Sequence, residues 1–215
     1  MGDRLAFVLG YGALFVVTAL WIVHQFLPRD QDKGILAARG GSVLATVSLG
    51  LGLVLRGFRV GYWPFHTAYE LSTVGLLGLV LASFLSLLPH RNGILSLTLS
   101  VLSSLLALYG LLSGTAADSA TLVLDSGWWA AYVVLCGFGG GLLTVAGVAG
   151  AVAHNSKGKE WVGERALAWS LLALSAGLAS GAWWFERLSG HYWGDARWGA
   201  TVAVWLLTMA AWHGR

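Results

Sequence analysis

Charge and cysteine are scarce in this 215-residue sequence, and each scarcity excludes a class of protein. Only 11% of the residues are charged, whereas soluble domains contain about 25%. In addition, 57% are hydrophobic and the mean hydropathy is +0.71. These values exclude an ordinary water-soluble domain and a disordered chain. The only cysteine, Cys136, excludes a disulfide framework and a cysteine-based metal cluster. Because the net charge is only +3 and no basic surface is apparent, we expect no nucleic-acid partner.

Long apolar runs fill most of the chain. A helix that crosses a bilayer needs roughly 20 mostly apolar residues, so the sequence has room for about seven. We predict an all-α polytopic membrane helix bundle, one transmembrane domain over residues 1–215, with external tryptophan-rich loops at 56–65, 114–127 and 189–197. The first run is too long for the core of a cleaved signal peptide. The predicted spans are 5–27, 35–55, 66–88, 93–113, 128–153, 166–188 and 198–212.

The basic residues predict an orientation. Seven spans divide the 13 Lys and Arg residues into five on the side of the N-terminus and eight on the other. Since cytoplasmic loops are enriched in Lys and Arg, we expect the N-terminus outside and the C-terminus in the cytoplasm. The expected location is a bacterial-type inner (plasma) membrane or an equivalent energy-transducing membrane. The eight residues of the cytoplasmic set are Arg29, Lys33, Arg39, Arg91, Lys157, Lys159, Arg165 and Arg215.

Aromatic residues gather on the predicted outer side. The chain has 12 Trp, and most lie at the outer ends of the predicted spans. One interpretation is an interfacial aromatic belt, although a belt should have two rims and the excess here is on one. The other is a surface that holds a flat apolar ligand such as a porphyrin by stacking. The outer aromatic residues are Tyr62, Trp63, Trp128, Trp129, Trp183, Trp184, Tyr192, Trp193 and Trp198.

Three segments with these aromatics resemble a known family. They read P-F-H-T-A-Y-E at 64–70, S-G-W-W-A-A-Y-V at 126–133, and G-A-W-W followed by G-H-Y-W-G-D at 181–195. Together with Trp205 and H-G-R at 213–215, they resemble the tryptophan-rich WWD region of the haem-handling cytochrome c assembly proteins, the group of CcsA, ResC and CcmC. The resemblance implies that haem is held on the outer face. The implied haem-contacting residues are Trp128, Trp129, Trp184, Tyr192, Trp193 and Asp195.

Departures from the family pattern suggest a divergent, shortened relative. Ser189 stands where the family has the first Trp of its loop. Tyr132 stands where the family has an external haem-ligating His. The sequence ends before the helix that precedes the second external His of the family. The resemblance therefore leaves His213, which matches a membrane-embedded family His, as the first candidate ligand.

The histidines supply two alternative ligand sets. His24 and His213 are both predicted near the inner rim, and they would be the axial ligands of one b-type haem if their helices are neighbours. Alternatively, each is an interfacial His that bonds to water or lipid phosphate. His66, His191 and Tyr132 lie at the outer rim and are candidates to replace the missing external ligands. The alternatives there are that His66 caps a helix and that His191 hydrogen-bonds within its loop.

Three functions follow from these patterns. The first is a haem-handling protein that serves a c-type cytochrome. The second is a membrane subunit of a larger electron-transfer complex, with a b-type haem and a possible quinone site. The third is a cofactor-free scaffold subunit. No catalytic triad or phosphate-binding loop indicates a classical enzyme, and Glu70 and Asp195 are expected to be structural. Expected partners are membrane lipids, other membrane subunits and a c-type cytochrome.

Overall fold

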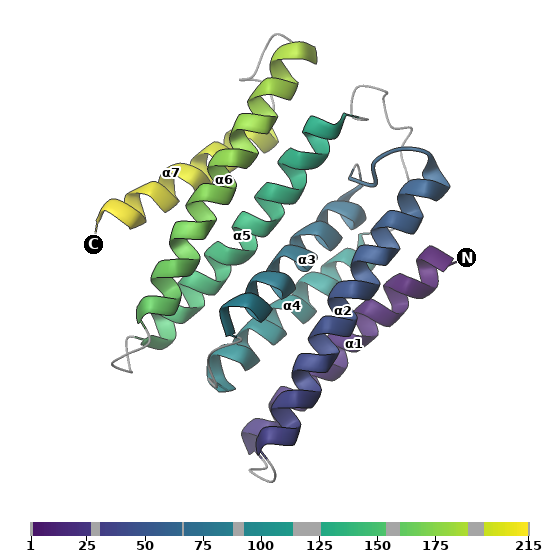
Figure 1. The fold of residues 1–215 in the computed structure, drawn as a ribbon, viewed down its shortest axis with the longest axis vertical. Helices are drawn as coiled ribbons and strands as arrows, with labels where there is room; N and C mark the ends of the chain where they lie inside the picture. Colours follow the sequence, from purple (N-terminus) through teal and green to yellow (C-terminus); the bar gives the residue numbers. More distant parts are fainter. Residues whose placement is uncertain are drawn as a thin grey trace.

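A computed structural model shows an all-α bundle, as predicted (Figure 1). It describes residues 2–26, 31–65, 67–87, 93–113, 126–153, 160–188 and 196–214. Each of the seven predicted apolar runs forms a helix. The helices are α1 (Gly2–Phe26), α2 (Gln31–Val60), α3 (Ala68–Leu87), α4 (Gly93–Leu112), α5 (Gly127–Ala153), α6 (Glu160–Leu188) and α7 (Ala196–His213).

Six of these helices, α1 to α6, are long and apolar enough to cross a membrane. Large apolar side chains such as Val8, Leu51, Leu105 and Leu172 are more than half exposed along them. In water this exposure would be unfavourable, whereas in a bilayer it provides the lipid contact. The chain is therefore a multi-pass membrane protein. The α7 helix has 18 residues with Arg197 and His213 at its ends, and a seventh crossing by α7 stays a prediction.

The helices form an extended array with α1 and α7 at opposite edges (Figure 1). The α5 helix packs along α6 on one side and α3 on the other, and α3 also contacts α2 and α4. The α1 helix packs against α2 and α4, whereas α7 packs against α6. Because successive helices alternate in direction, the N-terminus and the α2–α3, α4–α5 and α6–α7 connections share one end of the bundle. The division of the Lys and Arg residues into five and eight, from which the orientation is predicted, assumes this same grouping.

Glycines allow α3 and α5 to approach closely. The segment 137–141 of α5 contains four glycines, a composition typical of close helix packing in lipid. A Cβ atom on Gly78 would lie 2.4 Å from the carbonyl oxygen of Gly137. A Cβ on Gly141 would lie 2.6 Å from the backbone of Gly78. Such contacts are possible only where no side chain intervenes. The central pair of the bundle is thus held by backbone-to-backbone packing.

The predicted end of the second span is wrong by more than one turn. The α2 helix continues to Val60, so Arg56 and Arg59 belong to the helix and not to an external loop at 56–65. The helix ends at Gly61, whose φ of +77° suits glycine and whose N–H donates to the Gly57 carbonyl. The two arginines did not stop the helix because each meets a carboxylate within the bundle.

Candidate functional site

A cluster of aromatic side chains fills one end of the bundle, which we call the aromatic end. Its buried members come from the α2–α3 connection, α5, α6 and α7, and they are Phe65, Trp129, Tyr132, Trp184, Phe185 and Trp198. The rings of Trp129 and Trp184 lie 4.8 Å apart, and those of Trp184 and Phe185 lie 4.6 Å apart. Residues separated by more than 100 positions in the sequence therefore pack as one unit.

Convergence of Trp128, Trp129 and Trp184 is confirmed, but their faces are not equally available. Trp129 is 2% exposed and Trp184 is 6% exposed, because they cover each other. Trp128 is 50% exposed and lies 6.0 Å from Trp183, itself 46% exposed. Trp129 and Trp184 thus pack against each other in the cluster, whereas Trp128 and Trp183 keep exposed faces, and haem contact by Trp128, Trp129 and Trp184 stays a prediction.

Tyr132 connects the cluster to α7. Its hydroxyl forms a 2.8 Å hydrogen bond with the Thr201 hydroxyl, and its ring contacts Trp129 and Trp198. A Cβ on Gly181 would lie only 2.7 Å from the Tyr132 ring. Tyr132 is 5% exposed, so ligation of iron by its oxygen would require separation from Thr201. The structure gives this position a packing role.

Two ion pairs lie beside the cluster, where α1, α2 and α3 meet. Arg56 and Glu70 form a salt bridge with side chains 4% and 0% exposed. Arg59 pairs with Asp3 of α1 at 2.9 Å between Nη1 and Oδ2. Sequence reasoning missed both pairs, although a Glu and an Arg inside apolar spans were a signal that could have suggested them. A buried pair of this kind fixes the register of the two helices.

Glu70 also caps α3, which confirms the structural role expected for it. The Thr67 N–H donates to Glu70 Oε2 at 3.1 Å, and the Glu70 N–H donates to the Thr67 hydroxyl at 3.1 Å. This reciprocal arrangement is a capping box, which satisfies two donors at the start of a helix. One carboxylate thus begins α3 and holds α2. The segment between these helices is fixed at both ends.

An apolar groove of about 560 Å³ borders the aromatic end. It lies along the last two turns of α2 and the segment that follows, and its lining includes Val54, Phe58, Trp63 and Phe65. The Trp63 and Phe65 rings stack with centroids 6.2 Å apart. Ligand sites in proteins span about 300–1,000 Å³, so the groove is large enough for a small apolar molecule.

The proposed inner haem pair does not form within one chain. His24 belongs to α1 and His213 ends α7, and these helices lie at opposite edges of the bundle (Figure 1). The condition that their helices be neighbours is not met, since α3, α5 and α6 lie between them. His213 is exposed at the end of its helix. The side chain of His24 lies outside the described residues.

Other predicted site residues also lie outside the described residues. They are His66, His191, Tyr192, Trp193 and Asp195. Within the part of the chain that is described, no group of three or more His, Cys, Asp or Glu side chains could hold a metal ion. External ligation by His66 or His191 stays a prediction.

No protein-family model, curated protein or solved structure matches this chain. The function proposed below therefore rests on the sequence motifs and on the geometry of the described residues.

Proposed function

We propose that this membrane protein holds haem at the aromatic end of its bundle, as a divergent relative of the cytochrome c assembly proteins. The observation that supports the proposal is the exposed Trp128–Trp183 pair, each member of which is next in sequence to a member of the buried Trp129–Trp184 pair. Aromatic faces attract flat apolar rings by stacking and dispersion. Because the buried Trp129 and Trp184 fix the ends of α5 and α6 that carry the exposed pair, little conformational entropy is lost when a ligand binds.

The residues present fit one part of haem binding and not another. The stacking surface fits a porphyrin ring. The guanidinium carbon of Arg187 lies 5.0 Å from the centre of the Trp183 ring, where the positive charge would neutralise a porphyrin propionate. Ligation by His24 and His213 within one chain does not fit, because their helices are apart. His66 and His191, from the motifs at the aromatic end, are the proposed ligands. Bound haem would supply a redox-active iron.

Two porphyrins separate stacking from ligation. The chain is purified in neutral detergent, its haem content is measured as the pyridine haemochrome, and the stripped protein is titrated with haem and with metal-free protoporphyrin. Stacking alone gives binding of both. A contribution from histidine makes haem bind more tightly and gives a six-coordinate spectrum that His66→Ala or His191→Ala alters. Failure of the wild-type chain to bind either porphyrin contradicts the proposal and favours the scaffold function.

Matched tryptophan variants locate the binding surface. Replacement of Trp128 and Trp183 together by Leu should weaken protoporphyrin binding about tenfold or more, since each aromatic contact is worth about 0.5–1.5 kcal/mol. Trp169→Leu is the control, because Trp169 is 62% exposed on α6 and away from the aromatic end. Equal losses in the control and the double variant would place the porphyrin elsewhere on the protein.

A second candidate function is favoured by the groove beside α2. We propose that the chain alternatively serves as a membrane subunit of an electron-transfer complex and takes a quinone in this 560 Å³ apolar groove. Val54→Trp would fill the groove from an exposed position on α2. It should abolish binding of a short-chain quinone and leave protoporphyrin binding unchanged. The partner is sought by co-purification, with a c-type cytochrome and membrane subunits as the expected classes.

The proposed orientation places the aromatic end outside. The N-terminus and the α2–α3, α4–α5 and α6–α7 connections lie at that end, and the basic excess lies at the other. A reporter that is active only in the cytoplasm should be active when fused after Arg215 in a bacterial inner membrane. Activity of an export-dependent reporter at this position would reverse the orientation.

A further inference from the structure

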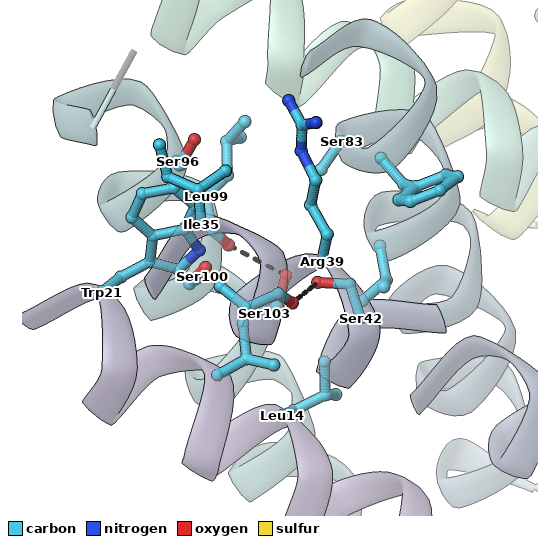
Figure 2. A pocket seen from close by; sticks show the side chains of 14 residues that line it. Leu14, Trp21, Ile35, Arg39, Ser42, Ser83, Ser96, Leu99, Ser100 and Ser103 are labelled. Carbon is cyan, nitrogen blue, oxygen red and sulfur yellow. Dashed lines mark hydrogen bonds between the residues drawn. The ribbon is translucent and has the colours of Figure 1, made fainter. Parts of the chain in front are cut away.

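A cavity lies among α1, α2, α3 and α4, in the half of the bundle away from the aromatic end (Figure 2). Its volume is about 60 Å³. A buried water needs a cavity volume of about 10–15 Å³, so this cavity holds about four waters or one group of similar size. A porphyrin does not fit here. The cavity therefore has a different occupant from the one proposed for the aromatic end.

The polar part of the lining is a guanidinium with a set of hydroxyls. Figure 2 shows Arg39 of α2 extended between serines of α4 on one side and Ser83 of α3 on the other. The described lining residues include one charged side chain, Arg39. The serines of the lining are Ser42, Ser83, Ser96, Ser100 and Ser103.

The hydroxyls differ in what they can offer to a ligand. Ser42, Ser83 and Ser103 donate their protons to carbonyls of their own helices, at 3.0, 2.6 and 2.8 Å. Ser96 and Ser100 donate to no group among the described residues, so their hydroxyls can turn toward the cavity. Arg39 adds several N–H donors in a planar fork. The donors of the lining therefore suit an oxyanion.

The rest of the lining is apolar and the position is shallow. The apolar lining residues include Leu14, Val17, Ile35 and Phe84. The apolar span of α2 begins at Ile35, so Arg39 lies only about 6 Å along the helix from that point, at 1.5 Å per residue. An arginine side chain at this depth reaches the level of lipid headgroups. A phospholipid could therefore place its phosphate group near Arg39 and the serines and its acyl chains against the apolar walls.

The charge around this end of the bundle also favours an anion. Two of the chain connections at this end, α1–α2 and α3–α4, together with the start of α2, contribute Arg29, Lys33 and Arg91 against Asp30 and Asp32 in the sequence. Arg39 adds to this positive excess. Basic pockets between transmembrane helices at such an interface are typical sites for anionic lipid headgroups.

We propose that this cavity binds a phosphate group, with Arg39, Ser96 and Ser100 as its donors, and that the phosphate belongs to an anionic phospholipid or is free inorganic phosphate. The inference is independent of haem binding, since it concerns other helices and the other end of the bundle.

Binding is measured on the full chain in neutral detergent by the rise of the unfolding temperature. The probes are dihexanoyl phosphatidylglycerol, dihexanoyl phosphatidylcholine and inorganic phosphate. A ligand that binds only the folded protein stabilises it in proportion to the logarithm of its concentration over Kd. Stabilisation by phosphatidylglycerol alone assigns the site to an anionic headgroup. Stabilisation by inorganic phosphate as well assigns it to the phosphate group itself.

Charge-matched variants decide whether the cavity is responsible. Arg39→Gln should weaken the effective ligand about tenfold or more, because a hydrogen bond to a charged group is worth about 1.5–3 kcal/mol. Arg165→Gln removes the same charge from an exposed position on α6, at the same end of the bundle, and should change affinity less than twofold. Equal affinities in the wild type and Arg39→Gln overturn the proposal, as does an equal loss in Arg165→Gln.

Milder variants keep the test decisive if Arg39→Gln does not fold. The double variant Ser96→Ala with Ser100→Ala should bind about threefold or more weakly, since it removes two hydroxyl donors worth at least about 0.5 kcal/mol each. Arg39→Lys keeps the charge and loses the planar fork, so it should bind less tightly than the wild type. Unchanged affinity in both variants overturns the proposal, and so does a wild type that none of the three probes stabilises.

Discussion

Two of the three arginines within the apolar span of α2 meet different surroundings. Arg56, at the aromatic end, is 3% exposed and pairs with Glu70, which itself caps α3. Arg39, at the other end, lines a cavity together with five serines. At the aromatic end the arginine pairs with a carboxylate in a closed core, whereas at the cavity end the arginine and the serines line an open volume.

The difference shows that polar groups in this bundle have two separate roles, holding helices in register and lining a ligand site. A buried ion pair whose remaining lone pairs are hydrogen-bonded holds helices in register but leaves nothing for a ligand. Hydroxyls that bond to their own helix stabilise no neighbour, so they can line a site without affecting the fold strongly. We therefore expect mutations of the buried polar groups at the aromatic end to lower stability, and mutations of the polar groups at the cavity end to lower binding.

The largest expected effect is that of Glu70→Ala. It leaves the buried Arg56 guanidinium without the Glu70 carboxylate and removes the cap of α3. We expect a loss of about 3–5 kcal/mol in the free energy of unfolding, measured by denaturation in mixed micelles. Glu164→Ala, at an exposed position of α6, is the control and should lie within about 0.5 kcal/mol of the wild type. A loss in Glu70→Ala no larger than in the control would contradict the assigned role of the pair.

A smaller loss is expected for Gly181→Ala in the aromatic cluster. The added Cβ would lie 2.7 Å from the Tyr132 ring and 2.8 Å from the Trp198 ring. Overpacking of this kind costs about 1–3 kcal/mol. In Gly147→Ala the new methyl meets no atom within 4 Å, so the same change should stabilise α5 by up to about 1 kcal/mol. Thermal unfolding of the two variants side by side measures the packing of the cluster. Similar unfolding midpoints would contradict the close packing of Gly181 against Tyr132 and Trp198.

Single hydroxyls provide a finer comparison of the two ends. The Thr73 hydroxyl donates to the Tyr69 carbonyl at 2.8 Å, so Tyr11 donates to Thr73 at 2.7 Å, between α1 and α3. Tyr11→Phe should cost about 1 kcal/mol because it breaks a buried bond between helices. Ser103→Ala should cost less than about 0.5 kcal/mol, since Ser103 bonds to Leu99 of its own helix. If Ser103→Ala proves the more damaging by denaturant titration, the contrast between the ends is wrong.

The smallest stability effect is expected for Trp128→Leu. Trp128 is half exposed and lies beside Trp183, whereas the adjacent Trp129 is in the buried cluster. The free energy of unfolding should change by about 0.5 kcal/mol or less, while protoporphyrin affinity falls. Fluorescence quenching by the porphyrin and thermal unfolding of the same sample measure both quantities. A large loss of stability would show that this residue supports the fold rather than a ligand.

Several features of the fold could be predicted because they depend on local composition. Apolar runs long enough to span a bilayer gave the helices, and they occur in the order expected. The glycine run 137–141 indicated a close helix contact, which α3 makes through Gly78. The predicted span 66–88 gave α3, which runs from Ala68 to Leu87. Each of these inferences needs only residues that are close in sequence.

The candidate site was predicted only in outline. Tryptophans from separate segments converge, but the sequence does not distinguish Trp129, which is buried, from the adjacent Trp128, which is half exposed. The α2 helix was predicted to end before Arg56 because charge normally ends an apolar span. The partner that neutralises Arg56 lies on the next helix, beyond the reach of a local pattern.

The sequence by itself determined that this protein is a multi-pass helical membrane protein with its aromatic residues concentrated at one end. Hydrophobic length and composition decide this, because in lipid each backbone polar group must bond within its own helix. The tertiary structure decided which helices are neighbours. It separated α1, with His24, from α7, with His213, and it placed Arg56 on Glu70 and Arg39 beside the serines of α4. Such neighbours depend on how side chains of distant segments fit together, and hydropathy has no information on that fit.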